Sequence, residues 1–232
     1  MIFLKIYFRT CSKILLNHTN ESYKNMAIKQ RDGSYAVVLD AAITTPQELK
    51  KIAEVLEKYG VSLIKFSESQ RMVIVGVDPE KVEEMCNEMG VKLANAVGRV
   101  VRSIKFCPGN TLCVMGLQNT IEMAQKLKKF DGMELPGKLK IAIAGCSNSC
   151  TEPAVRDIGL MGTKDGYTIF VGGSAGRKPR IGYVLAEKVS PEDAEKLVEK
   201  IIEFYKANAK NGQRLGDFID SIGFEEFKKA VL

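Results

Sequence analysis

The sequence predicts an α+β fold in two parts, and three observations support this prediction. Helical and β-type periodicities alternate over residues 34–95, the composition changes at about Ala94–Gly98, and strands with glycine-rich turns dominate the remainder. The chain has 232 residues, of which 45% are hydrophobic and 27% are charged, so it is long enough to form real cores. This composition excludes a disordered or collagen-like protein.

The first part contains a strand, a helix, two strands, a second helix and a short return strand, in that order. These elements are expected at residues 34–39, 45–60, 61–66, 71–77, 78–90 and 91–95, respectively. Thr45, Pro46 and Glu48 supply the N-cap, the first-turn proline and the capping-box glutamate of the first helix. This order suits a ferredoxin-like split βαβ unit.

The second part is a mixed α/β region that begins at about residue 98. We expect strands at residues 97–106, 140–145, 157–163, 167–173 and 181–189. A helix is expected at 118–130, a long amphipathic helix from Ser190 to about Ala209, and short helices at 215–232. The predicted organisation is therefore an extension over 1–25, a half-domain over 26–97 and a second domain over 98–232.

Residues 1–25 are expected to form a loosely attached extension that lies outside the functional site. The segment includes Cys11 and His18, the only histidine, and it is followed directly by a second methionine, Met26. Basic residues interrupt its apolar run and no small-residue cleavage site follows, so it is a poor signal peptide. Without an export signal or an apolar run of about 18 residues, the sequence predicts a cytoplasmic protein with no membrane span.

The formal charge of +6 does not indicate nucleic-acid binding. Half of this surplus lies in residues 1–25, which carry four basic residues and only one acidic residue. Aromatic residues make up 7% of the chain and tryptophan is absent, so the stacking surfaces of a nucleic-acid-binding module are not expected.

Four cysteines form the main chemical signal. Cys107 and Cys113 make a C-x5-C pair, Cys146 and Cys150 make a C-x3-C pair, and each pair follows a predicted strand. Four thiolates on two loops suit an iron-sulfur cluster or, less well at this wide spacing, a zinc ion. Free thiols and disulfides remain alternatives. Cys86 lies on the apolar side of a predicted helix and is interpreted as a buried hydrophobe.

The segments around these cysteines resemble the sirohaem and 4Fe-4S region of the sulfite and nitrite reductase family. The resemblance rests on CPGNTLC at 107–113, LPGKLK at 135–140, GCSNSC at 145–150 and VGGSAGRKPRIG at 171–182. It implies a 4Fe-4S cluster held by Cys107, Cys113, Cys146 and Cys150. It also implies that the sulfur of Cys150 bridges to the iron of a sirohaem.

The resemblance also implies roles for several polar residues. The expected anion-binding side chains, which occupy positions of basic residues in the family, are Arg71, Arg102, Lys138 and Lys140. Donors to the cofactors are expected from Arg177, Asn110, Thr111, Asn148 and Ser149. The alternatives are a solvated surface charge for any one lysine and a turn-forming role for any one loop residue.

The predicted function is the multi-electron reduction of sulfite to sulfide or of nitrite to ammonia, because cofactors of this kind deliver electrons that side chains cannot. Two alternatives are an electron-transferring or sirohaem-holding subunit without turnover, and a zinc-stabilised binding protein. No nicotinamide or flavin motif is present, so the electron donor is expected to be a separate protein such as a ferredoxin. In larger members of the family, the basic residues and the cluster cysteines belong to different copies of a repeated unit, whereas this chain has one copy of each. The resemblance therefore implies a homodimer in which the basic residues reach the partner's sirohaem, and the alternative is a monomer whose basic residues fold onto their own cofactor or onto none.

Overall fold

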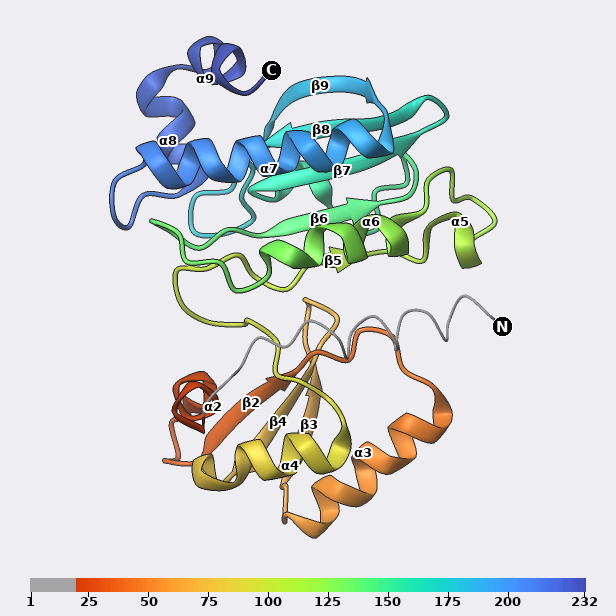
Figure 1. Cartoon of the computed structure of the whole chain (residues 1–232), viewed down its shortest axis with the longest axis vertical. Helices are drawn as coiled ribbons and strands as arrows, with labels where there is room; N and C mark the ends of the chain where they lie inside the picture. Colours follow the sequence, from red (N-terminus) through yellow and green to blue (C-terminus); the bar gives the residue numbers. More distant parts are fainter. Residues whose placement is uncertain (1–19) are drawn as a thin grey trace. The chain divides into compact units, whose positions relative to one another are not determined.

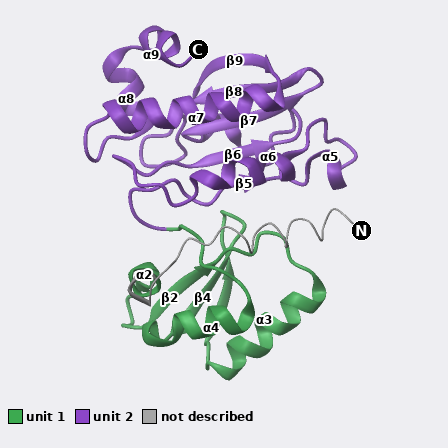
Figure 2. Cartoon of the chain, in the orientation of Figure 1, with its two compact units in different colours: residues 1–96 green, residues 97–232 purple. Residues whose placement is uncertain are grey.

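The computed structural model describes residues 20–232, so Cys11 and His18 lie outside the described residues. The chain divides into two compact units, unit 1 over Met1–Ala96 and unit 2 over Val97–Leu232 (Figure 2). Each unit has its own sheet and its own helices. Within residues 20–232, no helix is long and apolar enough to cross a membrane.

Unit 1 is built on a four-stranded antiparallel sheet with the order β1-β2-β4-β3 (Figure 1). Its strands are β1 (Ile28–Lys29), β2 (Tyr35–Leu39), β3 (Leu63–Phe66) and β4 (Met72–Val77). Its helices are α2 (Asn20–Met26), α3 (Pro46–Lys58), the short 3-10 helix η1 (Pro79–Lys81) and α4 (Val82–Met89). Helix α3 crosses from β2 to β3, and the return strand is reduced to a single bridge between Leu93 and Leu39. The ferredoxin-like prediction is confirmed.

Local sequence signals set the ends of these helices. The backbone N–H of Glu48 donates to Thr45 Oγ1 at 3.2 Å, and the Glu48 carboxylate accepts from the N–H of Thr45 at 2.8 Å. Asp78 accepts a hydrogen bond from the N–H of Glu80 at the start of η1. Helix α4 ends at Gly90, whose φ of 74° is the left-handed conformation that glycine adopts readily.

Residues 20–25 differ from the expected loose extension. They belong to helix α2, which contacts α4 and places Tyr23 in the hydrophobic core of unit 1 with 8% exposure. Burying an aromatic ring is favourable enough to hold a short helix in place. The prediction that the extension reaches residue 25 was therefore wrong for this segment.

Unit 2 contains a five-stranded mixed sheet with the order β5-β6-β7-β8-β9. Its strands are β5 (Lys105–Phe106), β6 (Ile141–Ala144), β7 (Ile158–Thr163), β8 (Gly166–Val171) and β9 (Tyr183–Val189). Strands β5, β6 and β7 are parallel, whereas β8 and β9 are antiparallel to their neighbours. The two cysteine pairs lie in the loops that follow β5 and β6, in the parallel half of the sheet.

The helices of unit 2 cover the sheet and close the chain. They are α5 (Gly109–Leu112), α6 (Thr120–Leu127), α7 (Pro191–Asn208), α8 (Leu215–Ile222) and α9 (Phe224–Val231), with short 3-10 helices η2 (Lys128–Phe130) and η3 (Pro153–Val155). Helices α6 and α7 lie across one face of the sheet and contact each other (Figure 1). Their buried side chains, including Leu127, Val198 and Ile202, form the core against the strands.

The strand expected at 97–106 is mostly irregular. Only Lys105–Phe106 is a strand, and Val100 and Val101 form isolated bridges with Glu134 and Leu139. The N–H of Val101 donates to Met133 O, and the N–H of Leu139 donates to Val100 O. The backbone of this segment therefore bonds to two irregular stretches, one around Met133 and one around Leu139, and does not pair along one neighbouring strand.

Candidate cofactor and anion site

The two cysteine loops begin at the same edge of the unit 2 sheet. Cys107 follows Phe106 at the end of β5, and Cys146 lies two residues after Ala144 at the end of β6. Strands β5 and β6 are parallel, with Phe106 opposite Ile143. Because the carboxyl ends of adjacent parallel strands lie at the same edge, the C-x5-C and C-x3-C loops emerge side by side.

Four glycines allow these loops to approach each other at backbone distance. A Cβ atom added to Gly109 would lie 2.6 Å from Gln118 O, and one added to Gly145 would lie 2.8 Å from the Cα of Gly109. A Cβ at Gly116 would meet the backbone of Gly109, and one at Gly162 would meet the carbonyl of Gly145. A side chain at Gly145 would push the two cysteine loops apart, one at Gly109 or Gly116 would distort the 107–118 segment, and one at Gly162 would displace Gly145.

The four sulfur atoms are available as ligands. Each of the four loop cysteines has a free thiol; those of Cys107 and Cys146 are half-buried, and those of Cys113 and Cys150 are exposed. The backbone N–H of Gly145 donates to Cys107 Sγ at 3.1 Å, a contact that stabilises thiolate charge and tunes a bound cluster. The donor set of four thiols on two loops fits a 4Fe-4S cubane.

Outside the two loops, the chain has one further cysteine among the described residues, Cys86. Within residues 20–232, no group of three or more Cys, His, Asp or Glu side chains, the four loop cysteines included, is already arranged around a single metal-ion position. Cys86 is buried in α4, as predicted, and burial raises the pKa of its thiol to about 12. A thiol that stays protonated is a poor metal ligand.

The polar residues of the cysteine loops make local contacts. Thr111 Oγ1 donates to Asn119 Oδ1 at 3.2 Å, and the N–H of Asn110 donates to Gln118 O at 3.0 Å. Asn148 is exposed, while Ser149, with φ of 52°, donates from Oγ to the sulfur of Met161 at 3.3 Å. These contacts shape the loops, and the expected roles of these residues as cofactor donors stay predictions.

Arg102 and Lys140 are brought together by the backbone. Val101 pairs with Leu139 in a parallel bridge, and the N–H of Arg102 donates to Leu139 O at 2.8 Å. Both residues are half-buried; Lys140 directly precedes β6, and Arg102 lies shortly before β5. Lys138 alternates with the buried Leu139 and is exposed.

The remaining basic residues from the sequence prediction lie in other surroundings. Arg177 is exposed in the loop between β8 and β9. Arg71 belongs to unit 1 and is only 4% exposed, so it is not a solvated surface charge. Its Nε donates to Asp40 Oδ1 at 2.8 Å, and its Nη1 donates to Ser69 O. The side chain of Arg71 is therefore held by a buried ion pair.

Sequence reasoning missed two charged residues beside Arg102 and Lys140. Asp157 is 1% exposed at the start of β7, where one carboxylate oxygen accepts from the N–H of Lys140 at 2.8 Å and from Nη2 of Arg214. Burial raises the pKa of Asp157, while Arg214 and Lys140 oppose that rise. The signal that could have found this pair is an aspartate in the apolar run that forms β7, because a buried carboxylate requires a basic partner.

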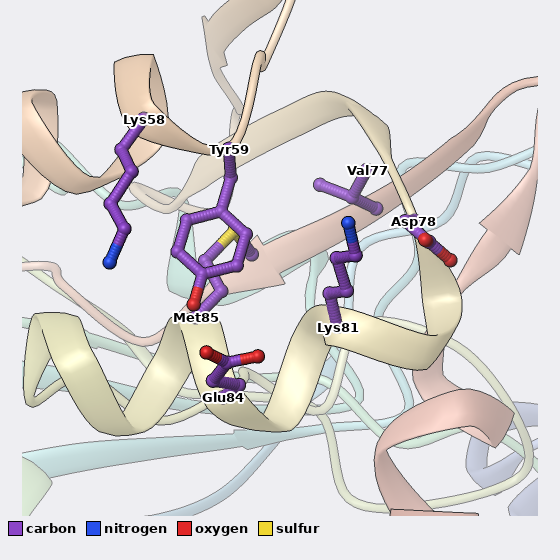
Figure 3. A pocket seen from close by; sticks show the side chains of 7 residues that line it. All are labelled: Lys58, Tyr59, Val77, Asp78, Lys81, Glu84 and Met85. Atoms are coloured by element: carbon purple, nitrogen blue, oxygen red, sulfur yellow. The ribbon is translucent and has the colours of Figure 1, made fainter.

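A hollow of about 290 Å³ lies in unit 1, and none of its lining residues is among those predicted for the site. It is lined by Lys58, Tyr59, Val77, Asp78, Lys81, Glu84 and Met85 (Figure 3). The hydroxyl of Tyr59 points toward Glu84, and burial, followed by the neighbouring Glu84, raises the pKa of Tyr59 to about 12. This phenol is a weak acid, and the hollow offers none of the thiols found in unit 2.

Comparison with known proteins supports the reductase resemblance. Residues 97–232 match the family described as nitrite and sulphite reductase 4Fe-4S domain, and residues 28–91 match the nitrite/sulfite reductase ferredoxin-like half domain. An assimilatory-type sulfite reductase of Nitratidesulfovibrio vulgaris is 39% identical over 210 residues, which are 89% of this chain and 96% of the relative.

Two further comparisons cover larger proteins. A nitrite reductase [NAD(P)H] of Bacillus subtilis is 28% identical over 87% of this chain, which spans only 26% of that relative. The crystal structure of dissimilatory sulfite reductase I shares the fold with a TM-score of 0.77 at 18% identity, over 85% of this chain and 69% of that one. Together these matches confirm the resemblance derived from the cysteine loops and the two cofactors expected with it, a 4Fe-4S cluster and sirohaem.

Proposed function

The chain belongs to the nitrite and sulphite reductase 4Fe-4S domain family, and we propose that within this family it is a small assimilatory-type sulfite reductase. The observation that carries the proposal is the close approach of the two cysteine loops after the adjacent parallel strands β5 and β6, which supports a site that draws on both pairs of thiols. The choice of sulfite is supported by the relative of similar length, whose printed name is an assimilatory-type sulfite reductase. Nitrite is the second candidate substrate.

The cysteines hold the redox centre in this proposal. Cys107, Cys113, Cys146 and Cys150 would hold the cluster, and Cys150 would also serve the sirohaem. When bound, this pair of cofactors would supply the electrons for reducing an oxyanion, which side chains cannot supply. The N–H of Gly145 stabilises the charge on the Cys107 sulfur, and the half-buried setting of Cys107 and Cys146 limits the access of water to them.

The basic residues bind and orient the anion in this proposal. Arg102 and Lys140 are the leading candidates, because a backbone pairing holds them next to each other. Lys138 and Arg177 are exposed and add positive charge that attracts anions. The role of Arg71 in anion binding stays a prediction, since its ion pair with Asp40 supports a structural role.

An assay of both substrates tests the proposal. The reconstituted chain, supplied with an artificial one-electron reductant, is expected to release sulfide from sulfite at a higher kcat/KM than it releases ammonia from nitrite. Sirohaem and cluster absorbance without release of either product would support an electron-transferring or sirohaem-holding subunit. A colourless, zinc-containing protein would contradict the proposal.

We further propose that electrons arrive from a separate protein and that two chains share their sites. Each family description matches this chain once, so one copy of the basic residues accompanies one copy of the cysteines.

An Arg102→Ala chain is expected to lose about 10- to 1,000-fold in kcat/KM. Mixing it with a Cys150→Ser chain should restore part of the activity if sites are shared, because one site of each mixed dimer regains its full set. A verified mixed dimer without recovery would contradict shared sites.

A further inference from the structure

Asp157 links three segments of unit 2 at one buried point. Its carboxylate accepts from the N–H of Lys140, just before β6, and from the guanidinium of Arg214, the residue that precedes α8. Its own carbonyl accepts from the N–H of Gly172 at the end of β8. Arg214 is therefore fixed to the start of β7 although it lies 57 residues further along the chain.

The surroundings of Arg214 are held tightly. A Cβ added to Gly216 would lie 2.5 Å from the carbonyl of Gly172, so the segment after Arg214 packs against the glycine-rich loop at 172–176 at backbone distance. Nη1 of Arg214 also lies 3.4 Å from Ser174 Oγ. The guanidinium consequently has little freedom to turn toward bulk water.

Arg102 is the charged neighbour of this guanidinium. The N–H of Arg102 donates to Leu139 O, and the N–H of the next residue, Lys140, donates to the Asp157 carboxylate that binds Arg214, so both arginines attach to the same short stretch of backbone. In keeping with this arrangement, burial and then the charge of Arg214 lower the pKa of Arg102. Arg102 Nη2 donates to Gly98 O at 2.9 Å, while the Nε atoms of Arg102 and Arg214 are buried and make no hydrogen bond to the residues that the structure describes. Asp157 balances only one of these two partly buried positive charges, so the second charge and the two unused Nε donors remain for a further anion.

We propose that Arg214 is a second anion-binding arginine, that it acts together with Arg102 on one oxygen anion, and that Asp157 is the residue that positions it. This inference rests on the proposed function, which supplies two sources for such an anion. One is a carboxylate of sirohaem, and the other is the sulfite or nitrite oxyanion. Guanidinium groups suit either source, because their forked donors match the geometry of oxygen anions.

The test compares Arg214→Gln with Arg214→Lys, Asp157→Asn and the control Lys206→Gln in the full chain. Lys206 is exposed on α7 and undergoes the same change of charge as Arg214→Gln. Two binding measurements are made by absorbance: the dissociation constant for sirohaem, and the sulfite concentration that half-saturates the spectral change of the oxidised haem. Neither depends on turnover.

Arg214→Gln is expected to weaken one of these two by about 10- to 100-fold, as loss of a charge-assisted hydrogen bond does. A higher dissociation constant for sirohaem alone assigns the arginine pair to a macrocycle carboxylate, whereas a higher half-saturating sulfite concentration alone assigns it to the substrate. Arg214→Lys should restore part of the binding, and Asp157→Asn should shift the same measurement by less than Arg214→Gln.

The inference would be overturned if both the sirohaem dissociation constant and the half-saturating sulfite concentration were the same in Arg214→Gln, in Lys206→Gln and in the wild-type chain. If Arg214→Gln does not fold, Arg214→Lys decides, and wild-type values for that variant would overturn it. If the wild-type chain binds no sirohaem, the proposed function fails separately. The arginine pair is then tested by thermal unfolding, with inorganic sulfate compared with chloride at equal ionic strength. A sulfate-specific rise in the unfolding temperature of the wild-type chain that is absent from Arg214→Gln supports the inference. An equal rise in both chains overturns it.

Discussion

The two units of this chain differ in how they use charge and sulfur. In unit 1, Arg71 is buried and its charge is met by Asp40, and Cys86 is a core side chain. In unit 2, Arg102 lies near a second arginine, and four cysteines occupy loops that open at a sheet edge. Arg71 and Cys86 are therefore satisfied within unit 1, whereas in unit 2 the four loop thiols and the Nε donor of Arg102 remain available.

This difference follows from the sheets. The antiparallel sheet of unit 1 has its strand ends joined by a tight turn, a helical crossover and short connections, and its helices bury the apolar side chains of β2 and β4. In unit 2 the parallel strands β5 and β6 direct their carboxyl ends to one edge, where irregular loops carry the reactive residues. We expect substitutions in unit 2 to remove chemistry and substitutions in unit 1 to remove stability.

The largest effect is expected from the matched cysteine variants Cys150→Ser and Cys86→Ala. Serine is a harder ligand with a much less acidic hydrogen, so Cys150→Ser should abolish the coupling between cluster and haem and all six-electron activity. Cys86→Ala should keep the wild-type absorbance, iron content and rate, because Cys86 is buried in the core of unit 1. Wild-type absorbance and rate in Cys150→Ser would refute the assignment of Cys150.

A second pair of variants separates backbone strain from the contact between the cysteine loops. Gly109 and Gly212 both have positive φ, at +58° and +84°, but only a Cβ at Gly109 would meet neighbouring atoms. Alanine at either position costs on the order of 1 kcal/mol for the left-handed backbone. Gly109→Ala should in addition displace the 107–118 loop and lower the iron content, measured per chain, whereas Gly212→Ala should keep it. Equal iron content in the two variants would mean that the close approach is not needed for the cluster.

The buried ion pair of unit 1 provides a test of stability. Arg71→Ala leaves Asp40, whose side chain is 9% exposed, without its guanidinium partner and should lower the free energy of unfolding by about 3–5 kcal/mol. Lys58→Ala removes one partner of the exposed Lys58–Glu88 pair and should change stability little. Urea unfolding measures both variants. If Arg71→Ala is as stable as Lys58→Ala, the pair with Asp40 does not hold the fold and a direct role of Arg71 in anion binding gains weight.

The smallest effect concerns the pH dependence contributed by Cys86. Burial raises the pKa of its thiol from 9.0 to about 12 in the folded chain, so its contribution to stability is complete below pH 9 and is lost as the pH rises from 9 toward 12. Between pH 8 and pH 10 the wild-type chain should lose about 1 kcal/mol more unfolding free energy than Cys86→Ala. Parallel stability curves for the two chains would show that the thiol is not held protonated.

The sequence by itself determined the features that depend on neighbouring residues. Thr45 with Glu48, Asp78 and Gly90 mark helix ends through hydrogen bonds and backbone conformations that span at most a few positions, and the structure shows each of them. The alternation of strands and helices predicted both parts of the fold. The spacing of the cysteines predicted a shared metal centre, because each pair is local even though the two pairs are not.

Only the tertiary structure decided which charges are satisfied and which backbones touch. Arg71 and Asp40 are 31 residues apart, and Arg214 and Asp157 are 57 residues apart, so no local pattern connects them. The docking of Tyr23 into the core and the contact of Gly145 with Gly109 likewise arise only when distant segments pack together. Charge pairing and close backbone approach depend on distances in space, and those distances are set by the sheet topology.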